Sequence, residues 1–536
     1  MLHHSRPWPF RTQIAATPLA SLLYLICLSS VLVAPPSSAS DARTVLMADA
    51  EAILYHSGLE QVQGRPERIA TNPVIANDKP WEVAIAYCSI QQNPSTGLYQ
   101  CWYQSYAGSR AQDPTRRVVL CYATSKDGLV WEKPSLGLYD FNGDPDTNIV
   151  LVGNGGRSVN YGASVLIDPR DSNPDRRYKL AYWDFSLTDE RERPGLCVAF
   201  SPDGIHWTKH PQAPLLQGAY GEPTQPPKQT EAGREPGTRP SISDVMDLMW
   251  DPMEAQFTLY TKTWVDAPDG RRFWKRAIVR TTSKDFLHWT QPELILNPDR
   301  PGDGQFHGLS VLHTHGLYLG LLQRLDFGGF DQGGLGSMPA ELIWSHNGRH
   351  WHRPFPDDWF LPLHPDPESF DAGCLWTSAT VIHHENVTYL YYGAYPSWHA
   401  DFQEQQTGIG VRVLPRDRWM GLRPQSSIGQ VTFKPWQMEA GTRLTLNADA
   451  SEGEFRVEWL DASGYRINGY TQADMNPLNG DHLEHQPSWH HGSRLAMPSG
   501  QYQLRVHIKD ATLYAITLYS PQTPLAPRWH TSIPGL

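Results

Sequence analysis

The sequence predicts an all-β protein, built as a five-bladed β-propeller followed by a C-terminal β-sandwich. Two internal repeats and a change of pattern after Trp419 predict this fold. The propeller is expected over residues 40–424 and the sandwich over residues 425–536. Amphipathic runs of helical period are nearly absent, and the 43 Gly and 45 Pro residues interrupt the chain too often for helices.

The first repeat is a short turn sequence: Ser, any residue, Asp or Asn, usually Gly, two further residues and Trp. Four copies occur, at 125–131 (SKDGLVW), 201–207 (SPDGIHW), 283–289 (SKDFLHW) and 345–351 (SHNGRHW). An Asp-Gly or Asn-Gly core between strand-like sequences is typical of a tight hairpin turn. Each copy therefore predicts a hairpin whose second strand begins at the Trp.

The second repeat is an aromatic-rich strand that precedes the turns. It recurs five times, beginning at Leu98, Tyr178, Phe257, Leu317 and Tyr389. Its alternating pattern indicates strands with one buried face. Five copies predict five blades, because four-stranded sheets packed radially around an axis leave few exposed strand edges.

The segment after Trp419 has a different pattern. Strands are expected at 444–448, 455–460, 465–470, 501–508 and 513–519, with no further copy of the turn sequence. These strands predict a separate β-sandwich in which Trp436 and Trp459 lie in the core.

The N-terminus predicts export. Arg6 and Arg11 precede an apolar stretch over 18–34, and small residues follow that stretch. This order is typical of a signal peptide, here residues 1–39, and the alternative is an uncleaved membrane anchor. Both alternatives place the rest of the chain in the periplasm, at the cell surface or outside the cell. A membrane partner is expected only if the segment stays uncleaved.

Composition narrows the choice of ligand. The formal net charge is -11 and no Lys/Arg-rich run occurs, so nucleic acid is not expected as a partner. The 20 Trp and 23 Tyr residues offer flat apolar faces that suit both sheet packing and the stacking of sugar rings. The cysteines match no zinc pattern, so we expect buried thiols and no metal site.

The repeats and the tail resemble a known group of proteins. The turn sequences, the segment LPRDRW at 414–419 and the run from Leu444 (LTLNADASEGEFRVEWLDASGYRINGYTQAD) resemble bacterial proteins related to glycoside hydrolase families 32 and 43. Those proteins are five-bladed propellers that cleave fructosides, arabinans or xylans, and in family 32 a β-sandwich follows. The resemblance implies a carbohydrate substrate and no required cofactor, with a Ca²⁺ ion in the channel as an analogy to family 43.

The resemblance also implies where the catalytic residues lie. In these families three carboxylates, each near the start of the innermost strand of a different blade, meet at one mouth of the central channel. Hydrolysis needs one carboxyl group as an acid and another to attack or to activate water. The matching residues here are Glu82 in the first blade, Asp244 in the third and Asp371 in the fifth. Asp247 is the alternative in the third blade.

Further residues near these positions are expected to bind the sugar: Trp81, Asn160, His307, Glu368, Trp398 and His399. Glu368 is also the alternative acid in the fifth blade. A structural role is the alternative for His307, and core packing is the alternative for Trp398 and His399. Asp168 and Asp251 lie at the far ends of inner strands and are expected to be turn residues.

One motif of family 32 is missing. That family has an Asn-Asp-Pro-Asn motif where this chain has Thr71, Asn72 and Pro73, without a carboxylate. The leading hypothesis, a secreted glycoside hydrolase, therefore has two alternatives. One is a carbohydrate-binding propeller without catalysis, and the other is a propeller that serves as an interaction scaffold.

Overall fold

The computed structural model describes residues 42–522, except 155–160, 186–193, 219–239, 270–273, 327–335, 400–404, 491 and 493–494. The expected signal segment lies outside the described residues. Within them, no helix combines the length and the apolar character that crossing a membrane requires.

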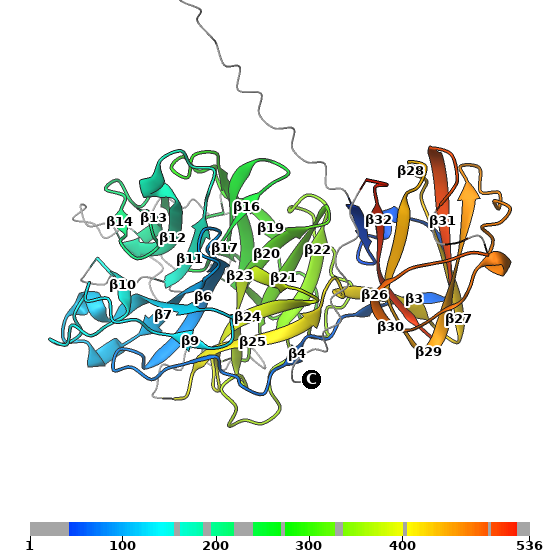
Figure 1. Ribbon diagram of the computed structural model, residues 1–536. Helices are drawn as coiled ribbons and strands as arrows, with labels where there is room; N and C mark the ends of the chain where they lie inside the picture. Colours follow the sequence, from blue (N-terminus) through cyan, green and yellow to red (C-terminus); the bar gives the residue numbers. More distant parts are fainter. Residues whose placement is uncertain are drawn as a thin grey trace, which may run out of the picture. The chain divides into compact units, whose positions relative to one another are not determined.

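Five antiparallel sheets form the blades of the expected propeller (Figure 1). The innermost strands of blades 1 to 5 are β6 (Ala84–Gln92), β11 (Tyr161–Ile167), β16 (Met246–Asp251), β20 (Gln305–Thr314) and β23 (Cys374–His384). Each inner strand contacts the next one, and β23 contacts β6, so the ring is closed. The fold class predicted from the sequence is confirmed.

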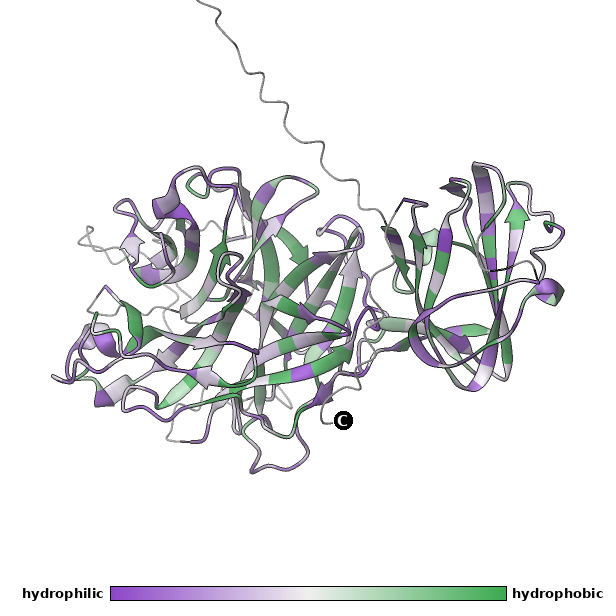
Figure 2. Ribbon diagram, in the orientation of Figure 1, coloured by the Kyte–Doolittle hydropathy of each residue, from purple (hydrophilic) through white to green (hydrophobic). Residues whose placement is uncertain are grey.

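The remaining strands of each blade follow outward from the inner strand. They are β7 (Tyr99–Tyr106), β8 (Val118–Ser125), β9 (Trp131–Glu132) and β10 (Ile149–Val152) in blade 1; β12 (Tyr178–Phe185), β13 (Pro194–Ser201), β14 (Thr208–Lys209) and β15 (Leu216–Gln217) in blade 2; β17 (Gln256–Val265), β18 (Lys275–Ser283) and β19 (Glu293–Leu296) in blade 3; β21 (Leu317–Leu325) and β22 (Ala340–Ser345) in blade 4; β24 (Val387–Tyr395) and β25 (Gly408–Pro415) in blade 5. The second strand of every blade is one of the five aromatic runs. Apolar residues are concentrated along these strands (Figure 2), and the five cysteines after residue 42 are buried, free thiols.

The repeated turn sequence is held by its own side chains. In the first copy Ser125 Oγ donates a hydrogen bond to Asp127 Oδ1, which also accepts from the backbone N–H of Leu129 and of Val130. The indole N–H of Trp131 donates to the carbonyl of Gly128. The Ser, Asp and Trp of the repeat thus satisfy the turn's backbone groups, which explains why these residue types recur.

The same turns fasten neighbouring blades together. Gly128 O in blade 1 accepts a hydrogen bond from Tyr391 Oη of blade 5 at 2.9 Å. Gly204 O in blade 2 accepts from Trp102 Nε1 of blade 1 at 2.6 Å. Each donor is an aromatic residue of a second strand, so the two sequence repeats meet at the joints between blades.

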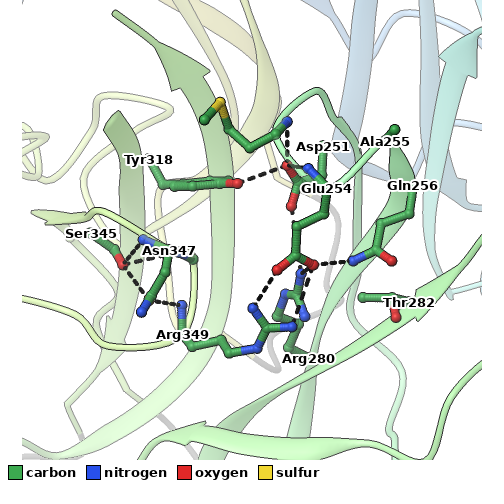
Figure 3. A network of polar contacts seen from close by, with 12 residues as sticks. Asp251, Glu254, Ala255, Gln256, Arg280, Thr282, Tyr318, Ser345, Asn347 and Arg349 are labelled. Atoms are coloured by element: carbon green, nitrogen blue, oxygen red, sulfur yellow. Dashed lines mark hydrogen bonds and ion pairs between the residues drawn. The ribbon is translucent and has the colours of Figure 1, made fainter. Parts of the chain in front are cut away.

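Charged side chains reinforce the joint between blades 3 and 4 (Figure 3). Arg349 of the blade 4 turn lies 2.6 Å from Glu254, which follows the inner strand of blade 3, and Arg280 of β18 binds the same carboxylate at 3.0 Å. Tyr318 Oη of blade 4 donates to Asp251 Oδ1 at 2.7 Å. Asp251 also accepts from the backbone N–H of residue 253, as expected for a turn residue.

Two short strands from the N-terminus complete the propeller. β4 (Glu67–Arg68) and β5 (Ile75–Ala76) pair with β25 and form the outer edge of blade 5. The outer strands of the sheet that begins at residue 374 therefore come from residues that precede the first blade. Sequence periodicity cannot reveal such a long-range pairing.

The second unit is a ten-stranded sheet around its own core, and it fits the expected β-sandwich. Its strands are β1 (Ala42–Leu46), β2 (Ile53–Ser57), β3 (Leu59–Gln63), β26 (Met420–Pro424), β27 (Ile428–Phe433), β28 (Trp436–Met438), β29 (Arg443–Asp461), β30 (Leu478–His485), β31 (Gly500–Lys509) and β32 (Thr512–Tyr519). Trp436 and Trp459 lie in its core as expected.

The sandwich differs from the sequence-based expectation in three respects. Residues 42–63 and 420–424 belong to its sheet, whereas the expected boundary assigned them to the propeller. The expected strands 444–448 and 455–460 are two halves of the continuous β29, which pairs β32 and β31 in turn. The segment 465–470 is mostly turn and has a single bridge, Leu460 to Arg466. Asp461 Oδ1 accepts hydrogen bonds from two backbone N–H groups, and these bonds hold the start of that segment in a turn.

The joint between blades 1 and 2 should tolerate no side chain at its turn glycine, Gly204. Gly204 has φ +81°, and a Cβ there would lie 2.5 Å from Trp102 Cζ2, whereas at Gly137 (φ +64°) a Cβ would meet nothing within 4 Å. Both Gly→Ala changes carry the left-handed strain of about 1–2 kcal/mol, and only Gly204→Ala adds overpacking of about 1–3 kcal/mol. We expect a clearly lower urea midpoint for Gly204→Ala than for Gly137→Ala. Equal midpoints would contradict the role given to the joint.

Candidate active site

Polar side chains from blades 1, 3, 4 and 5 contact or electrostatically influence one another near the starts of the inner strands. We call this set the mouth cluster: Tyr87, Asp244, Asp247, Lys262, Arg276, His307 and His399. Three of its members, Asp244, His307 and His399, are residues that the sequence predicted, and a fourth, Asp247, is the alternative that it gave for the third blade.

Local irregularities in the inner strands bring Tyr87 and His307 together. The register of β6 shifts between Ala86 and Cys88, and that of β20 shifts between Phe306 and Gly308, so both residues lie at bulges. Tyr87 has φ +42°, a backbone conformation that few non-glycine residues adopt. Its Oη lies 3.0 Å from His307 Nε2. A bulge redirects a side chain out of the normal alternation, which is why these two meet across the channel.

Asp244 is paired with a lysine from the neighbouring strand. Lys262 Nζ of β17 lies 2.6 Å from Asp244 Oδ1, and Ser243 Oγ donates to the same oxygen at 3.0 Å. The Lys262 side chain is 6% exposed, whereas that of Asp244 is 33% exposed and therefore reachable from solvent. Burial alone would raise the pKa of Asp244, but the Lys262 ammonium outweighs it and lowers this pKa to about 2. Asp244 is thus an accessible, ionised carboxylate.

Asp247, three residues further, has the opposite electrostatic environment. It is buried, and its Oδ1 accepts a hydrogen bond from Ser310 Oγ of β20 at 2.9 Å. Ser310 in turn lies 2.6 Å from Thr377 Oγ1 of β23, so a chain of hydroxyl groups crosses three blades. Burial raises the pKa of Asp247 to about 7, with the Ser310 hydrogen bond as a smaller opposing effect. Asp247 can therefore hold a proton near neutral pH.

Tyr87 lies close to both carboxyl groups. Its pKa is raised well above the usual value, first by burial and then by electrostatic interaction with the acidic groups of Asp244, Tyr395 and Asp247. The phenol therefore stays protonated and can donate a hydrogen bond. The ring centroids of Tyr87 and Trp376 are 5.8 Å apart, so an aromatic wall adjoins these polar groups.

The two histidines stay neutral. Their ring centroids are 4.5 Å apart in an edge-on arrangement. Burial lowers the pKa of His307 well below the usual range, and His399, Lys262 and Arg276 lower it further. The pKa of His399 is lowered by burial and then by Arg276 and Lys262. The pair consequently offers neutral ring nitrogens as donors and acceptors rather than positive charge.

Glu82 lies in a different environment from the mouth cluster. Its side chain is buried and accepts from Tyr103 Oη at 2.6 Å, from Lys133 Nζ at 2.7 Å and from the backbone N–H groups of residues 78 and 79. Tyr103 and Lys133 belong to the second strand and the outer region of the same blade. These contacts indicate that Glu82 anchors the loop before β6 to blade 1. None of them is with a member of the mouth cluster.

Asp371 has an equivalent environment in blade 5. It accepts from Tyr392 Oη at 2.9 Å and from Ser369 Oγ at 2.6 Å, and it forms an ion pair with Arg68 Nε at 3.1 Å. Tyr392 stands 21 residues after Asp371, and Tyr103 stands 21 residues after Glu82. The two predicted catalytic carboxylates are therefore copies of one structural contact.

That contact recurs in other blades and explains the repetition seen in the sequence. In blade 4 Asp303 pairs with Arg353 at 2.9 Å, and in blade 2 Lys209 Nζ donates to Asn154 Oδ1 at 2.6 Å. Lys133, Lys209 and Arg353 each follow the Trp of the turn repeat by two residues. A polar residue before the inner strand thus meets a basic residue of the outer region, which is a sufficient reason for carboxylates to recur at that position.

The other predicted sugar-binding residues are spread over different environments. Trp81 is buried in a core cluster, where its indole N–H donates to Asn148 Oδ1 at 3.1 Å. Glu368 is exposed on the loop before β23, and Trp398 is 49% exposed just after β24. Asn160 lies outside the described residues.

Sequence reasoning missed Tyr87, Lys262 and Arg276. A usable signal existed for Lys262, because it is a lysine inside the otherwise apolar and hydroxyl-bearing run FTLYTKTW. Tyr87 gave no such signal, since its position depends on a bulge.

The described residues contain no group of three or more His, Cys, Asp or Glu side chains that could hold a metal ion. A channel Ca²⁺ therefore stays an analogy, with no cluster of ligands in the described part of the chain to place it.

Comparisons with known proteins give a likeness of fold. The sequence matches no protein-family model and no curated protein. Among solved structures, the chain is similar to a glycoside hydrolase (13% identity, TM-score 0.44, 66% of this chain and 92% of the other). It is also similar to a thermostable family-43 glycoside hydrolase (13%, 0.40, 64% and 91%) and to a glycosyl hydrolase from Bacteroides ovatus (18%, 0.39, 65% and 94%).

The structural role of Glu82 can be tested by its effect on stability. Glu82→Gln would leave the Lys133 ammonium, which is 9% exposed, without its closest buried counter-charge. We expect a loss of about 3 kcal/mol in the free energy of unfolding. Glu368→Gln, the same change at an exposed position, should stay within about 0.5 kcal/mol of the parent. Urea unfolding of both variants measures the difference, and a neutral Glu82→Gln would remove the structural role.

Proposed function

We propose that the protein is a glycoside hydrolase that uses Asp244 and Asp247 as its catalytic carboxyl groups. The observation that carries this proposal is a pair of carboxyl groups on one blade, beside Tyr87, whose surroundings hold them in opposite protonation states. Glycoside hydrolysis needs such a pair, because one group must give a proton to the leaving oxygen while the other attacks or activates water.

Asp244 has the properties of the basic partner. Its carboxylate is ionised, partly exposed and held by Lys262 and Ser243. In this position it either attacks the anomeric carbon or removes a proton from water. Lys262 keeps it ionised in acidic surroundings and fixes its orientation.

Asp247 has the properties of the acid. Burial keeps its proton in place near pH 7, and the hydrogen bond from Ser310 fixes the carboxyl group. A general acid works best when its pKa lies near the working pH. Tyr87 and His307 lie beside the two acids and supply donors and acceptors for sugar hydroxyl groups.

The substrate class that fits this site is a polysaccharide or oligosaccharide. Tyr87, which is partly exposed, stands among the polar groups, and an aromatic ring beside hydrogen-bonding groups suits a sugar ring. With the N-terminal sequence typical of export, we propose that the enzyme acts outside the cytoplasm.

A second candidate function is carbohydrate binding without catalysis. It is favoured by the structural contacts of Glu82 and Asp371, which leave only one of the three predicted catalytic carboxylates in the mouth cluster. The two candidates differ in a single measurable quantity, the release of product.

The pH dependence of hydrolysis tests the roles of the two acids. The active form has Asp244 ionised and Asp247 protonated, so kcat/KM should be flat in mild acid and fall about tenfold per pH unit above about 7 as Asp247 loses its proton. Product release from a glycan panel, followed by chromatography between pH 4 and 9, measures this profile. A profile that rises through pH 8 would contradict the assignment of Asp247 as the acid.

Substitution of each acid tests the same assignment independently. Asp247→Asn should lower kcat/KM by roughly 10²–10⁴-fold and abolish the decline at alkaline pH. Asp244→Asn should lower it at least as strongly, while Glu368→Gln serves as a matched control on an exposed loop. Thermal unfolding of each variant confirms that the fold is retained. Binding of a glycan without any product from the unaltered protein would favour the second candidate function.

A further inference from the structure

We propose that the sugar substrate carries an anionic group, and that Lys262, Arg276, His307 and His399 receive this group at the mouth. The inference rests on the proposed function, because it names the chemical class of substrate for the same site. A uronic acid carboxylate and a sugar sulfate share the required chemistry.

The two cations of this subsite come from neighbouring strands of blade 3. Lys262 lies on β17 and Arg276 on β18, where Arg276 is the cross-strand partner of Trp264. The Arg276 guanidinium lies 4.6 Å from the centre of the Trp264 ring, and its Nη1 donates to Gln305 Oε1 at 2.8 Å. The stacking and the hydrogen bond fix the plane of the guanidinium, and a planar guanidinium is well suited to the recognition of a carboxylate or sulfate.

Both cations act on the two histidines. Lys262 and Arg276 are among the groups that lower the pKa of His307 and of His399, so their positive charge acts on both imidazoles. Among the described residues, Lys262 and Arg276 shift the pKa of His307 in the direction expected of cations, and at His399 Asp244 opposes them. An anion placed beside the rings would therefore meet a favourable potential.

A buried nitrogen in the subsite points to a missing partner. His307 is 1% exposed, and its Nε2 is paired with Tyr87 Oη. Among the described residues its Nδ1 has no hydrogen-bond partner, although buried polar atoms normally have one. When Tyr87 donates to Nε2, the proton of the neutral ring is on Nδ1, which is then a donor directed at an acceptor. An oxygen of an anionic sugar substituent supplies that acceptor.

The subsite lies next to the proposed chemistry. Lys262 touches Asp244, and His307 touches Tyr87, so a ligand anchored through its anionic group would place its ring against the two carboxyl groups. Neutral histidines matter here, because they offer hydrogen bonds to the anion without adding charge that would have to be desolvated.

Binding and cleavage measured side by side test the inference. The full chain is titrated by calorimetry with three oligosaccharides of matched length: a neutral one, one with uronic acid carboxylates and one with sulfate esters. Product release from the same three is followed by chromatography. We expect one of the acidic ligands to bind roughly tenfold to a hundredfold more tightly than the neutral one, and its affinity to fall with added salt.

Variants locate the effect. Arg276→Gln should remove most of the preference for the acidic ligand, and Arg276→Lys should restore part of it. Arg65→Gln, at an exposed ion pair with Asp358, is the matched control and should leave the preference unchanged. If Arg276→Gln unfolds, the salt dependence of the unaltered protein and the His307→Asn variant provide the same comparison.

The outcomes separate this inference from the proposed function. Preferred binding and cleavage of an acidic ligand support both. Preferred binding of an acidic ligand with no product from any glycan supports the anionic subsite and overturns the hydrolase. Equal binding and cleavage of the neutral ligand overturn the anionic subsite and leave the hydrolase in place. Absence of binding to all three ligands overturns the subsite.

Discussion

The structure depends on the hydrogen bond by which an aromatic side chain of one blade reaches the turn of the next. Tyr391 with Gly128, and Trp102 with Gly204, are two instances. Tyr260 with Gly348 is a third, at 3.2 Å. The aromatic hydroxyl or indole group satisfies a buried carbonyl, and its ring fills the space above a glycine. The same contact therefore also fixes the orientation of neighbouring sheets. In the blade 3 turn Phe286 replaces the glycine, and its ring centroid lies 5.8 Å from that of Phe200 in the preceding blade. Apolar packing therefore replaces the hydrogen bond at this joint.

A rigid ring allows irregular inner strands at the mouth. The bulges at Tyr87 and His307 interrupt regular pairing on strands whose other residues are paired and mostly buried. Strain of this kind persists only where the surroundings determine the conformation. The contrast between Asp244 and Asp247 arises in the same way, because a lysine stands beside one and only hydroxyl groups stand beside the other.

The sequence predicted the architecture well because repetition is a one-dimensional signal. Ser125 to Trp131 and its three relatives mark the turns directly, and the aromatic runs mark the second strands. The candidate site was predicted only in part, since recurrence at the same blade position identified Glu82 and Asp371, and recurrence proved to reflect a structural contact with Lys133 and Arg68. The residues of the proposed site are by contrast ones that break the repeat. Lys262 occurs in one blade, and Tyr87 depends on a bulge that no local pattern announces. The N-terminal strands were missed because their partners lie hundreds of residues away.

The participation of the N-terminus in both units has a consequence for how the chain can be handled. β1 pairs with β32, the last strand of the sandwich, while β4 completes the outer edge of blade 5. On the ribosome β1 must therefore wait for β32 before the sandwich has all its described strands, whereas β4 can pair as soon as β25 has been made. A truncated gene that stops at residue 424 would yield a propeller trailing orphaned strands, with open edges that invite aggregation. A sandwich expressed separately would have to include residues 42–63 as well as the C-terminal strands.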